Sequence, residues 1–188
     1  STLIDLRTNF PYAVIKIDSA EADDIIGALT IEKSTPLIGE DVVIVSADKD
    51  FIQLQKYGHV VQWSPMFNKA VKADNPVKYI FEHILKGDSS DGVPNVLSPD
   101  NTFVDGLRQK PLSKKKIAAM IGGEFPNDEV KRNFQRNKKL IDLDKSPTSL
   151  LSECVNAYNA APEGDRSKLL NYFTQKRLRN LVESIGEF

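Results

Sequence analysis

The stretch Val42-Val43-Ile44-Val45-Ser46-Ala47-Asp48-Lys49-Asp50 decides the fold that this sequence predicts. It opens with an unbroken apolar run, which is typical of a strand inside a parallel sheet. Asp48 and Asp50 follow that run directly. Ligands of open α/β sheets bind in the crevice beyond the carboxyl ends of the strands. We therefore expect both carboxylates to face a binding crevice.

Strand and helix patterns alternate around this stretch and then give way to helices alone. Before Gly87 the sequence predicts strands at 13–17, 42–45, 60–63 and around Val71, and helices at 20–31, 50–57 and 75–86. After Gly87 it predicts only helices, at 113–121, 129–140, 149–160, 167–175 and 178–185. The prediction is an α/β fold: residues 1–86 form part of a mainly parallel sheet with flanking helices, and residues 87–188 form an all-helical lobe.

Two further acidic groups accompany Asp48 and Asp50 at the ends of predicted elements. They are Glu21, Asp23 and Asp24, and then Asp88 and Asp91. Carboxylates gathered in one cleft oppose one another's ionisation unless a cation neutralises them. Oxygen ligands select Mg²⁺ or Mn²⁺ rather than Zn²⁺, and pairs of such ions serve phosphoryl transfer. The pattern predicts a metal-dependent nuclease.

Two alternative explanations of these carboxylates remain open. Asp and Glu often cap helices or occupy their first turn, and Asp18 or Ser19 could cap the helix that contains Asp23. The recurrence of three acidic groups favours a metal site over capping alone. The other alternative is a phosphatase-like domain with Asp48 as covalent nucleophile, which is weaker because such an Asp normally ends the first strand of its fold.

Charge is unevenly distributed along the 188 residues, although the net charge is only −1. Acidic residues dominate 18–50 and basic residues dominate 108–139, which suits a protein that holds a polyanion. A helix beginning after Ser113 offers free N–H groups to a phosphate, and basic residues recur on one face of the next helix. The predicted nucleic-acid-binding residues are Ser113, Lys114, Lys115, Lys116, Arg132, Arg136 and Lys139. The alternative is an ordinary solvated surface.

The remaining chemically distinctive residues point to structural roles. His59 and His83 belong to separate predicted elements and are interpreted as surface or packing residues, and Trp63 as a core residue. The lone Cys154 excludes a disulfide within the chain and favours a reducing compartment. No apolar run approaches membrane-spanning length. We expect a cytoplasmic monomer without membrane contact.

Three segments together resemble a known family. Glu21-Ala22-Asp23-Asp24, Ser46-Ala47-Asp48-Lys49-Asp50-Phe51-Ile52-Gln53-Leu54 and Lys86-Gly87-Asp88-Ser89-Ser90-Asp91-Gly92-Val93-Pro94 resemble the successive acidic motifs of the 5′-nuclease superfamily. That superfamily includes flap endonucleases and the exonuclease domain of bacterial DNA polymerase I. Gln62-Trp63-Ser64-Pro65-Met66 and Ser184-Ile185-Gly186-Glu187-Phe188 resemble more closely the ribonuclease H group of T-even-type bacteriophages, which removes RNA primers.

The resemblance implies a 5′-nuclease that uses two Mg²⁺ or Mn²⁺ ions and a water nucleophile, with no covalent intermediate. It places Glu21, Asp23, Asp24 and Asp48 at or around the first metal, and Asp50, Asp88 and Asp91 around the second. The implied substrates are RNA–DNA and DNA duplexes with 5′ ends or flaps. Replication proteins, such as a single-strand binding protein or a sliding clamp, are the implied partners, and a phage-encoded enzyme would act in the cytoplasm of its bacterial host.

Two departures from the family pattern qualify this expectation. The family's further aspartates on the first strand, and its arch for single strands, have no match here, so we expect a carboxyl-terminal fragment with little or no activity of its own. The alternative function is a non-catalytic duplex-binding module. Residues 95–109 also replace the family's Gly-rich hairpin, so the resemblance gives no support for the K⁺ site that often accompanies it.

Overall fold

The computed structural model describes residues 2–35, 37–162 and 165–188, and it divides the chain into two compact units. One unit is Glu21–Leu151, and the other combines the residues up to Ala20 with Ser152–Phe188. The boundary predicted near Gly87 lies within the first unit. The division into an α/β part, 1–86, and a helical lobe, 87–188, does not coincide with these compact units and remains a prediction.

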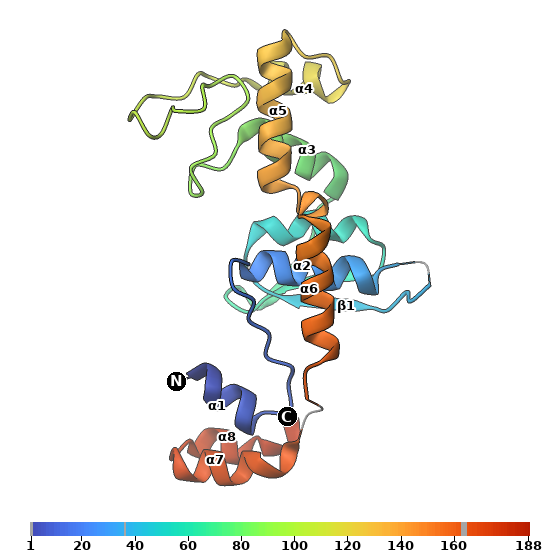
Figure 1. Ribbon diagram of the computed structural model, residues 1–188, viewed down its shortest axis with the longest axis vertical. Helices are drawn as coiled ribbons and strands as arrows, with labels where there is room; N and C mark the ends of the chain where they lie inside the picture. Colours follow the sequence, from blue (N-terminus) through green and yellow to red (C-terminus); the bar gives the residue numbers. More distant parts are fainter. Residues whose placement is uncertain (1, 36, 163–164) are drawn as a thin grey trace. The chain divides into compact units, whose positions relative to one another are not determined.

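A three-stranded sheet lies in the first unit, with strand order β1-β2-β3. Figure 1 labels its first strand, β1. The strands are β1 (Val42–Val45), β2 (Val60–Ser64) and β3 (Lys69–Val71). β1 and β2 are parallel, with Val45 opposite Trp63, whereas β3 runs antiparallel to β2. The predicted α/β class is confirmed, but the sheet is mixed because only one of its two strand pairs is parallel.

The sheet is covered less completely than the sequence predicts. Ile44 is buried, yet Val43 and Val45 are each 65% exposed, since β1 is an edge strand with one open face. Trp63 is 39% exposed rather than part of the core, because the residues of β2 alternate between the two faces. The strand predicted at 13–17 is also wrong, since these residues form no regular element.

Two helices and one face of the sheet enclose a small core. α2 (Ala22–Lys33) packs against η1 (Lys49–Lys56), a 3₁₀ helix that starts four residues after β1 ends and also contacts β2. The buried side chains of this core are Ile44, Phe51, Leu54 and Val60. The carboxyl end of β1 and the amino end of α2 line the same cleft, and the first two acidic groups lie at these two ends.

A second, larger core joins α3 (Pro76–Lys86), α4 (Lys114–Ile121) and α5 (Asp128–Ile141). α3 contacts α5, α4 and η1, so it links this core to the one beneath the sheet. Apolar residues recur at helical spacing on the inner faces; Ile80, Ile84, Leu85, Met120, Val130 and Phe134 are buried there. The third acidic group follows α3 directly.

The other unit is helical and is built around aromatic side chains. Its helices are α1 (Thr2–Asn9), residues 152–159 of α6 (Thr148–Asn159), α7 (Leu169–Gln175) and α8 (Arg179–Glu183), with short 3₁₀ turns η3 (Arg166–Lys168) and η4 (Ile185–Glu187). Phe173 is fully buried and its ring lies 5.8 Å from Phe10 and 5.3 Å from Phe188. Among all described residues, no helix is long and apolar enough to cross a membrane.

Candidate metal centre

Carboxylates from three separate segments line one cleft of about 710 Å³ in the first unit. The segments are the start of α2, the loop between β1 and η1, and the loop after α3. Six of the seven acidic residues predicted for the site lie on its wall: Glu21, Asp23, Asp48, Asp50, Asp88 and Asp91. The structure thus brings them together; their role as metal ligands remains a prediction.

The first segment both caps a helix and faces the cleft. Glu21 is the N-cap of α2 and forms a capping box with Asp24, whose Oδ2 accepts from the Glu21 N–H at 3.1 Å. Glu21, not Asp18 or Ser19, is therefore the cap. Asp24 also accepts from the Ser146 hydroxyl at 3.4 Å and lines only a smaller adjoining pocket. Asp23 is the residue of this helix that faces the main cleft.

The second segment is held by hydrogen bonds to its backbone. Asp48 caps η1, since its Oδ1 accepts from the Asp50 N–H at 3.0 Å. The Asp48 N–H donates to Ser46 Oγ at 3.1 Å. Gln62, fully buried in β2, donates from Nε2 to the main-chain oxygens of Ser46 at 3.0 Å and Asp48 at 2.5 Å. The loop therefore presents its two aspartates from a fixed backbone.

The third segment depends on a glycine that no other residue can replace without strain. Gly87 ends α3 with a φ of +68°, and a Cβ there would lie 2.4 Å from the Val93 main-chain oxygen. This close approach lets the chain turn back, so that the Val93 N–H donates to the Asp88 main-chain oxygen at 2.7 Å. Asp88 Oδ1 accepts from the Ser90 N–H at 2.8 Å. The other carboxylate oxygen, Oδ2, faces α3.

His83 joins the acidic residues, although its sequence context indicated only a surface or packing residue. Its Nε2 lies 3.4 Å from Asp50 Oδ1 and 3.5 Å from Asp88 Oδ2, and its ring stacks on that of Tyr79. Nε2 is buried and has no hydrogen-bond partner among the described residues. Sequence reasoning missed His83 because its placement depends on the packing of α3 against η1, which no local pattern encodes.

The carboxylates oppose one another's ionisation, as expected of a site built for a cation. Burial, followed by the charges of Asp48 and Asp50, raises the pKa of Asp23 to about 6. Burial also raises the pKa of Asp50, although His83 acts in the opposite direction. The Ser90 hydroxyl lowers the pKa of Asp88 by a hydrogen bond. These carboxylate oxygens carry like charges that repel one another, and they lie beside a buried nitrogen that makes no hydrogen bond. Such a set of ligands fits a divalent metal ion.

The residues predicted to bind nucleic acid fall into two groups in the structure. Ser113 caps α4 by accepting from the Lys116 N–H at 3.3 Å, and Lys114, Lys115 and Lys116 are exposed in its first turn. Lys139 is exposed on α5. These side chains are accessible to a phosphate backbone, and their binding role remains a prediction.

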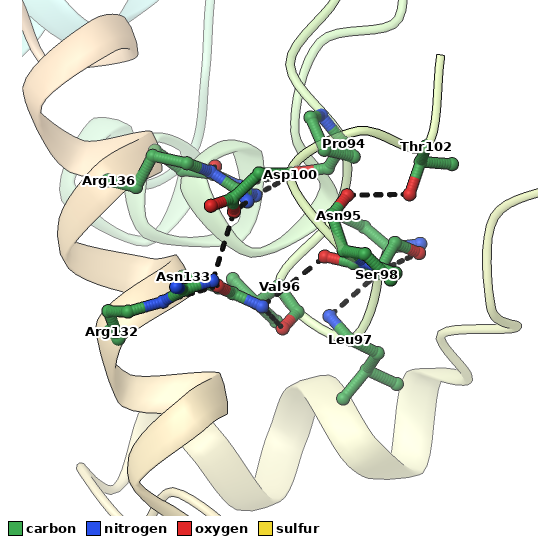
Figure 2. Close-up of polar contacts among 12 residues, drawn as sticks. Pro94, Asn95, Val96, Leu97, Ser98, Asp100, Thr102, Arg132, Asn133 and Arg136 are labelled. Atoms are coloured by element: carbon green, nitrogen blue, oxygen red, sulfur yellow. Dashed lines mark hydrogen bonds and ion pairs between the residues drawn. The ribbon is translucent and has the colours of Figure 1, made fainter. Parts of the chain in front are cut away.

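Arg132 and Arg136 are instead engaged within the protein (Figure 2). Both form ion pairs with Asp100, and Arg136 also donates to the Pro94 main-chain oxygen at 2.9 Å. The side chain of Arg136 is only 20% exposed, whereas that of Arg132 is 62% exposed. Arg136 therefore stabilises the loop after the third acidic segment, a role that helical periodicity alone does not reveal.

Two buried asparagines of α5 hold the same loop, and the sequence reading did not identify them. Asn137 donates to the main-chain oxygens of Ile84 and Pro94, both at 2.9 Å. Asn133 donates to that of Val96 at 3.0 Å (Figure 2). Both asparagines recur with Val130 and Phe134 on the buried face of α5, and polar residues on such a face are the available signal.

Comparisons with known proteins identify families and relatives that the chain resembles over most of its length. Residues 75–188 match the family described as T4 RNase H, C terminal, and residues 2–81 match 5'-3' exonuclease, N-terminal resolvase-like domain. The ribonuclease H of Enterobacteria phage T4 is 37% identical over 98% of this chain and 63% of its own length. DNA polymerase I of Streptococcus pneumoniae serotype 4 is 37% identical over 67% of this chain and 15% of its own length. DNA polymerase I of Bacillus subtilis is 24% identical over 97% of this chain and 22% of its own length.

Proposed function

Because the chain belongs to the T4 RNase H family, with a first part that matches the 5′-3′ exonucleases, we propose that it is a metal-dependent 5′-nuclease domain. Its proposed substrates are RNA–DNA and DNA duplexes with 5′ ends or flaps, as in the removal of RNA primers. The chain spans 63% of the length of the phage T4 ribonuclease H and less of the polymerases. The activity and partners of a whole protein of that kind are part of this proposal.

The observation that supports the proposal best is the cleft lined by six carboxylates. Capping explains Glu21 and Asp48 but not the placement of Asp23 and Asp91 on the same wall. Nor does it explain why the pKa of Asp23 is raised to about 6. A structural cluster would gain nothing from this repulsion, whereas divalent ions would remove it.

We assign two divalent ions, Mg²⁺ or Mn²⁺, to this cleft. When bound, the two ions would supply an activated water and neutralise charge on the leaving oxygen of a phosphodiester. Glu21, Asp23 and Asp48 would hold the first ion, with Asp24 supporting Glu21 through the capping box. Asp50, Asp88 and Asp91 would hold the second. No side chain of the chain forms a covalent bond to the substrate in this scheme.

We assign duplex binding to the exposed basic residues around α4 and the end of α5. The first turn of α4 combines Lys114, Lys115 and Lys116 with the free N–H groups of a helix start, which attract phosphate. Lys139 adds a further exposed cation. Such contacts position a duplex without reading its sequence. Arg136 acts indirectly by holding the loop between the cleft and α4.

The test is cleavage of 5′-labelled flap and RNA–DNA substrates by the purified chain with and without Mn²⁺. We expect slow hydrolysis at most, since the further aspartates that the resemblance implies have no match in the sequence. Any hydrolysis should require the metal and should be lost in Asp48→Asn but retained in Asp41→Asn, which removes an exposed carboxylate outside the cleft. Cleavage that persists with EDTA or in Asp48→Asn would contradict the proposal.

The second candidate is a duplex-binding module without catalysis. It is favoured by the exposed basic turn of α4, which can act whether or not the cleft is complete. The two candidates differ in one measurable respect. A nuclease domain should bind Mn²⁺ in the acidic cleft, whereas a simple binding module should bind duplex without any divalent ion in that cleft.

A further inference from the structure

We propose that His83 is a nitrogen ligand of the metal ion held by Asp50 and Asp88, and that it biases this position toward Mn²⁺ over Mg²⁺. This inference rests on the proposed function, because it assumes that the cleft binds divalent ions. It goes further by naming a ligand outside the acidic motifs and a metal preference.

The geometry around Nε2 of His83 supports a ligand role. Nε2 lies 3.4 Å from Asp50 Oδ1 and 3.5 Å from Asp88 Oδ2, and the three residues offer ligand atoms within 4.8 Å of one another. Adjacent corners of an octahedron with ligands at roughly 2.1 Å lie about 3.0 Å apart. The two distances from Nε2 are each within about half an ångström of that separation, so Nε2 lies close to where a ligand beside either carboxylate would be.

The surroundings of His83 fix its ring in this direction. The ring of Tyr79, one turn earlier on α3, stacks on the imidazole with centroids 6.0 Å apart and planes inclined by 7°. α3 packs against η1, and this contact brings His83 next to Asp50 in the first turn of η1. Nε2 is buried and has no hydrogen-bond partner among the described residues. A buried nitrogen without a hydrogen bond is costly, and a metal ion between Nε2 and the two carboxylates would satisfy all three groups.

The chemistry of the donor set then indicates the metal preference. Mg²⁺ keeps oxygen ligands and bound water, so a nitrogen donor adds little to its binding. First-row transition ions bind imidazole more readily, and Mn²⁺ is the ion of that series that also accepts a carboxylate-rich site. One histidine among carboxylates should therefore favour Mn²⁺ at this position, while the purely carboxylate position beside Asp23 should discriminate less.

Pulsed electron paramagnetic resonance of Mn²⁺ bound to the purified chain tests the ligand directly. We expect nitrogen hyperfine coupling that changes when histidine is labelled with ¹⁵N. The coupling should disappear in His83→Gln and remain in His59→Gln, which replaces the only other histidine of the chain. Because isotope labelling needs no substitution, the result does not depend on whether His83→Gln folds.

Titrations with Mn²⁺ and Mg²⁺ supply the second measurement. His83→Gln should weaken Mn²⁺ binding about tenfold or more and Mg²⁺ binding much less. Mn²⁺ binding by the parent chain without histidine coupling would overturn this inference and leave the proposed function standing, with His83 as a simple neighbour of the site. Failure of the parent chain to bind either ion in the cleft would overturn the proposed function, and this inference with it.

Discussion

The side-chain amide of Gln62 donates to the main-chain oxygen of Asp48, with 2.5 Å between the two atoms. Gln62 is fully buried in β2, and its Oε1 is held in turn by Gln55 at 3.4 Å. Parallel pairing of β1 with β2 sets the register that makes this contact possible. The position of Asp48 in the cleft is therefore fixed by a polar side chain in the neighbouring strand.

Gln62→Leu should loosen the acidic cleft without changing any acidic residue. The main-chain oxygens of Ser46 and Asp48 would lose their donor, which should reduce the free energy of unfolding by about 1–3 kcal/mol. Mn²⁺ binding should weaken about tenfold, as when a supporting residue of a metal site is removed. Urea unfolding and Mn²⁺ titration measure the two effects. Gln135→Leu, at an exposed position of α5, is the matched control and should change neither.

Most elements of the fold could be predicted from sequence, and the failures have physical reasons. Apolar periodicity and caps locate β1, α3 and α5 to within a few residues of their observed ends. The apolar run Val42–Val45 predicts that Val43 and Val45 are buried, but both are exposed. Burial depends on which helices or loops pack on a sheet face, and the sequence of a strand does not specify them. Residues 13–17 have strand propensity, but no strand of the described residues pairs with them, so propensity alone predicted a strand that does not form.

Asn137→Leu should destabilise the loop between α3 and α4. The substitution keeps much of the side-chain volume but removes the side-chain donor to the Ile84 main-chain oxygen and leaves that of Pro94 with Arg136 as its side-chain donor. We expect a loss of about 2–4 kcal/mol in the free energy of unfolding, because both hydrogen bonds are buried. Thermal or urea unfolding measures it. An equal effect of Asn156→Leu, at an exposed position, would show that the loss is not specific to these bonds.

Asp23→Asn should stabilise the metal-free chain near neutral pH and have little effect in acid. The folded chain raises the pKa of Asp23 from 3.8 to about 6, so the carboxylate disfavours folding once it is ionised. Below about pH 4 both states hold the proton; the gain should grow from about pH 4 to 6 and then level off. We expect about 1 kcal/mol, since solvent screens a partly exposed group.

Urea unfolding in EDTA across this pH range measures the effect of Asp23→Asn. Saturating Mn²⁺ should reverse its sign at pH 7.5, because the parent chain would then gain stability from a ligand that the variant lacks. A stabilisation that is the same at pH 4 and pH 7.5 would show that repulsion among the carboxylates is not its cause.

Lys115→Ala with Lys116→Ala should weaken duplex binding through the loss of phosphate contacts. Each lost contact should reduce the slope of log K against log salt by about 0.9. Binding measured by fluorescence anisotropy across a salt series tests this expectation. Lys72→Ala removes an exposed cation distant in sequence from α4 and is the control. Equal slopes for the parent chain and the double variant would identify these lysines as solvated surface.

Arg136→Ala should behave differently from the lysine variants. Its guanidinium binds Asp100 and the Pro94 main-chain oxygen, so the main effect should be a loss of stability of about 1–3 kcal/mol. The salt slope of duplex binding should stay close to that of the parent chain. A flattened salt slope with unchanged stability would show instead that Arg136 contacts phosphate, as its helical spacing predicts.

The candidate site was predictable where it depends on local motifs and not where it depends on packing between distant segments. The acidic groups are visible because each lies beside the start or the end of a helix or strand, and the structure places six of their residues on one cleft. His83 is five residues before Asp88 within a helix, and only the packing of α3 against η1 brings it to Asp50. Likewise, the partners of Arg136 lie in a loop about 40 residues earlier.

Anomalous diffraction from crystals of the chain soaked in Mn²⁺ shows whether metal ions bind in the acidic cleft, because it locates the ions without relying on activity. We expect anomalous peaks within coordination distance of Asp50 and Asp88, and at higher Mn²⁺ a second position beside Asp23 and Asp48. Crystals that bind Mn²⁺ only outside the cleft, or that show no peak at these carboxylates at saturating Mn²⁺, would contradict this expectation.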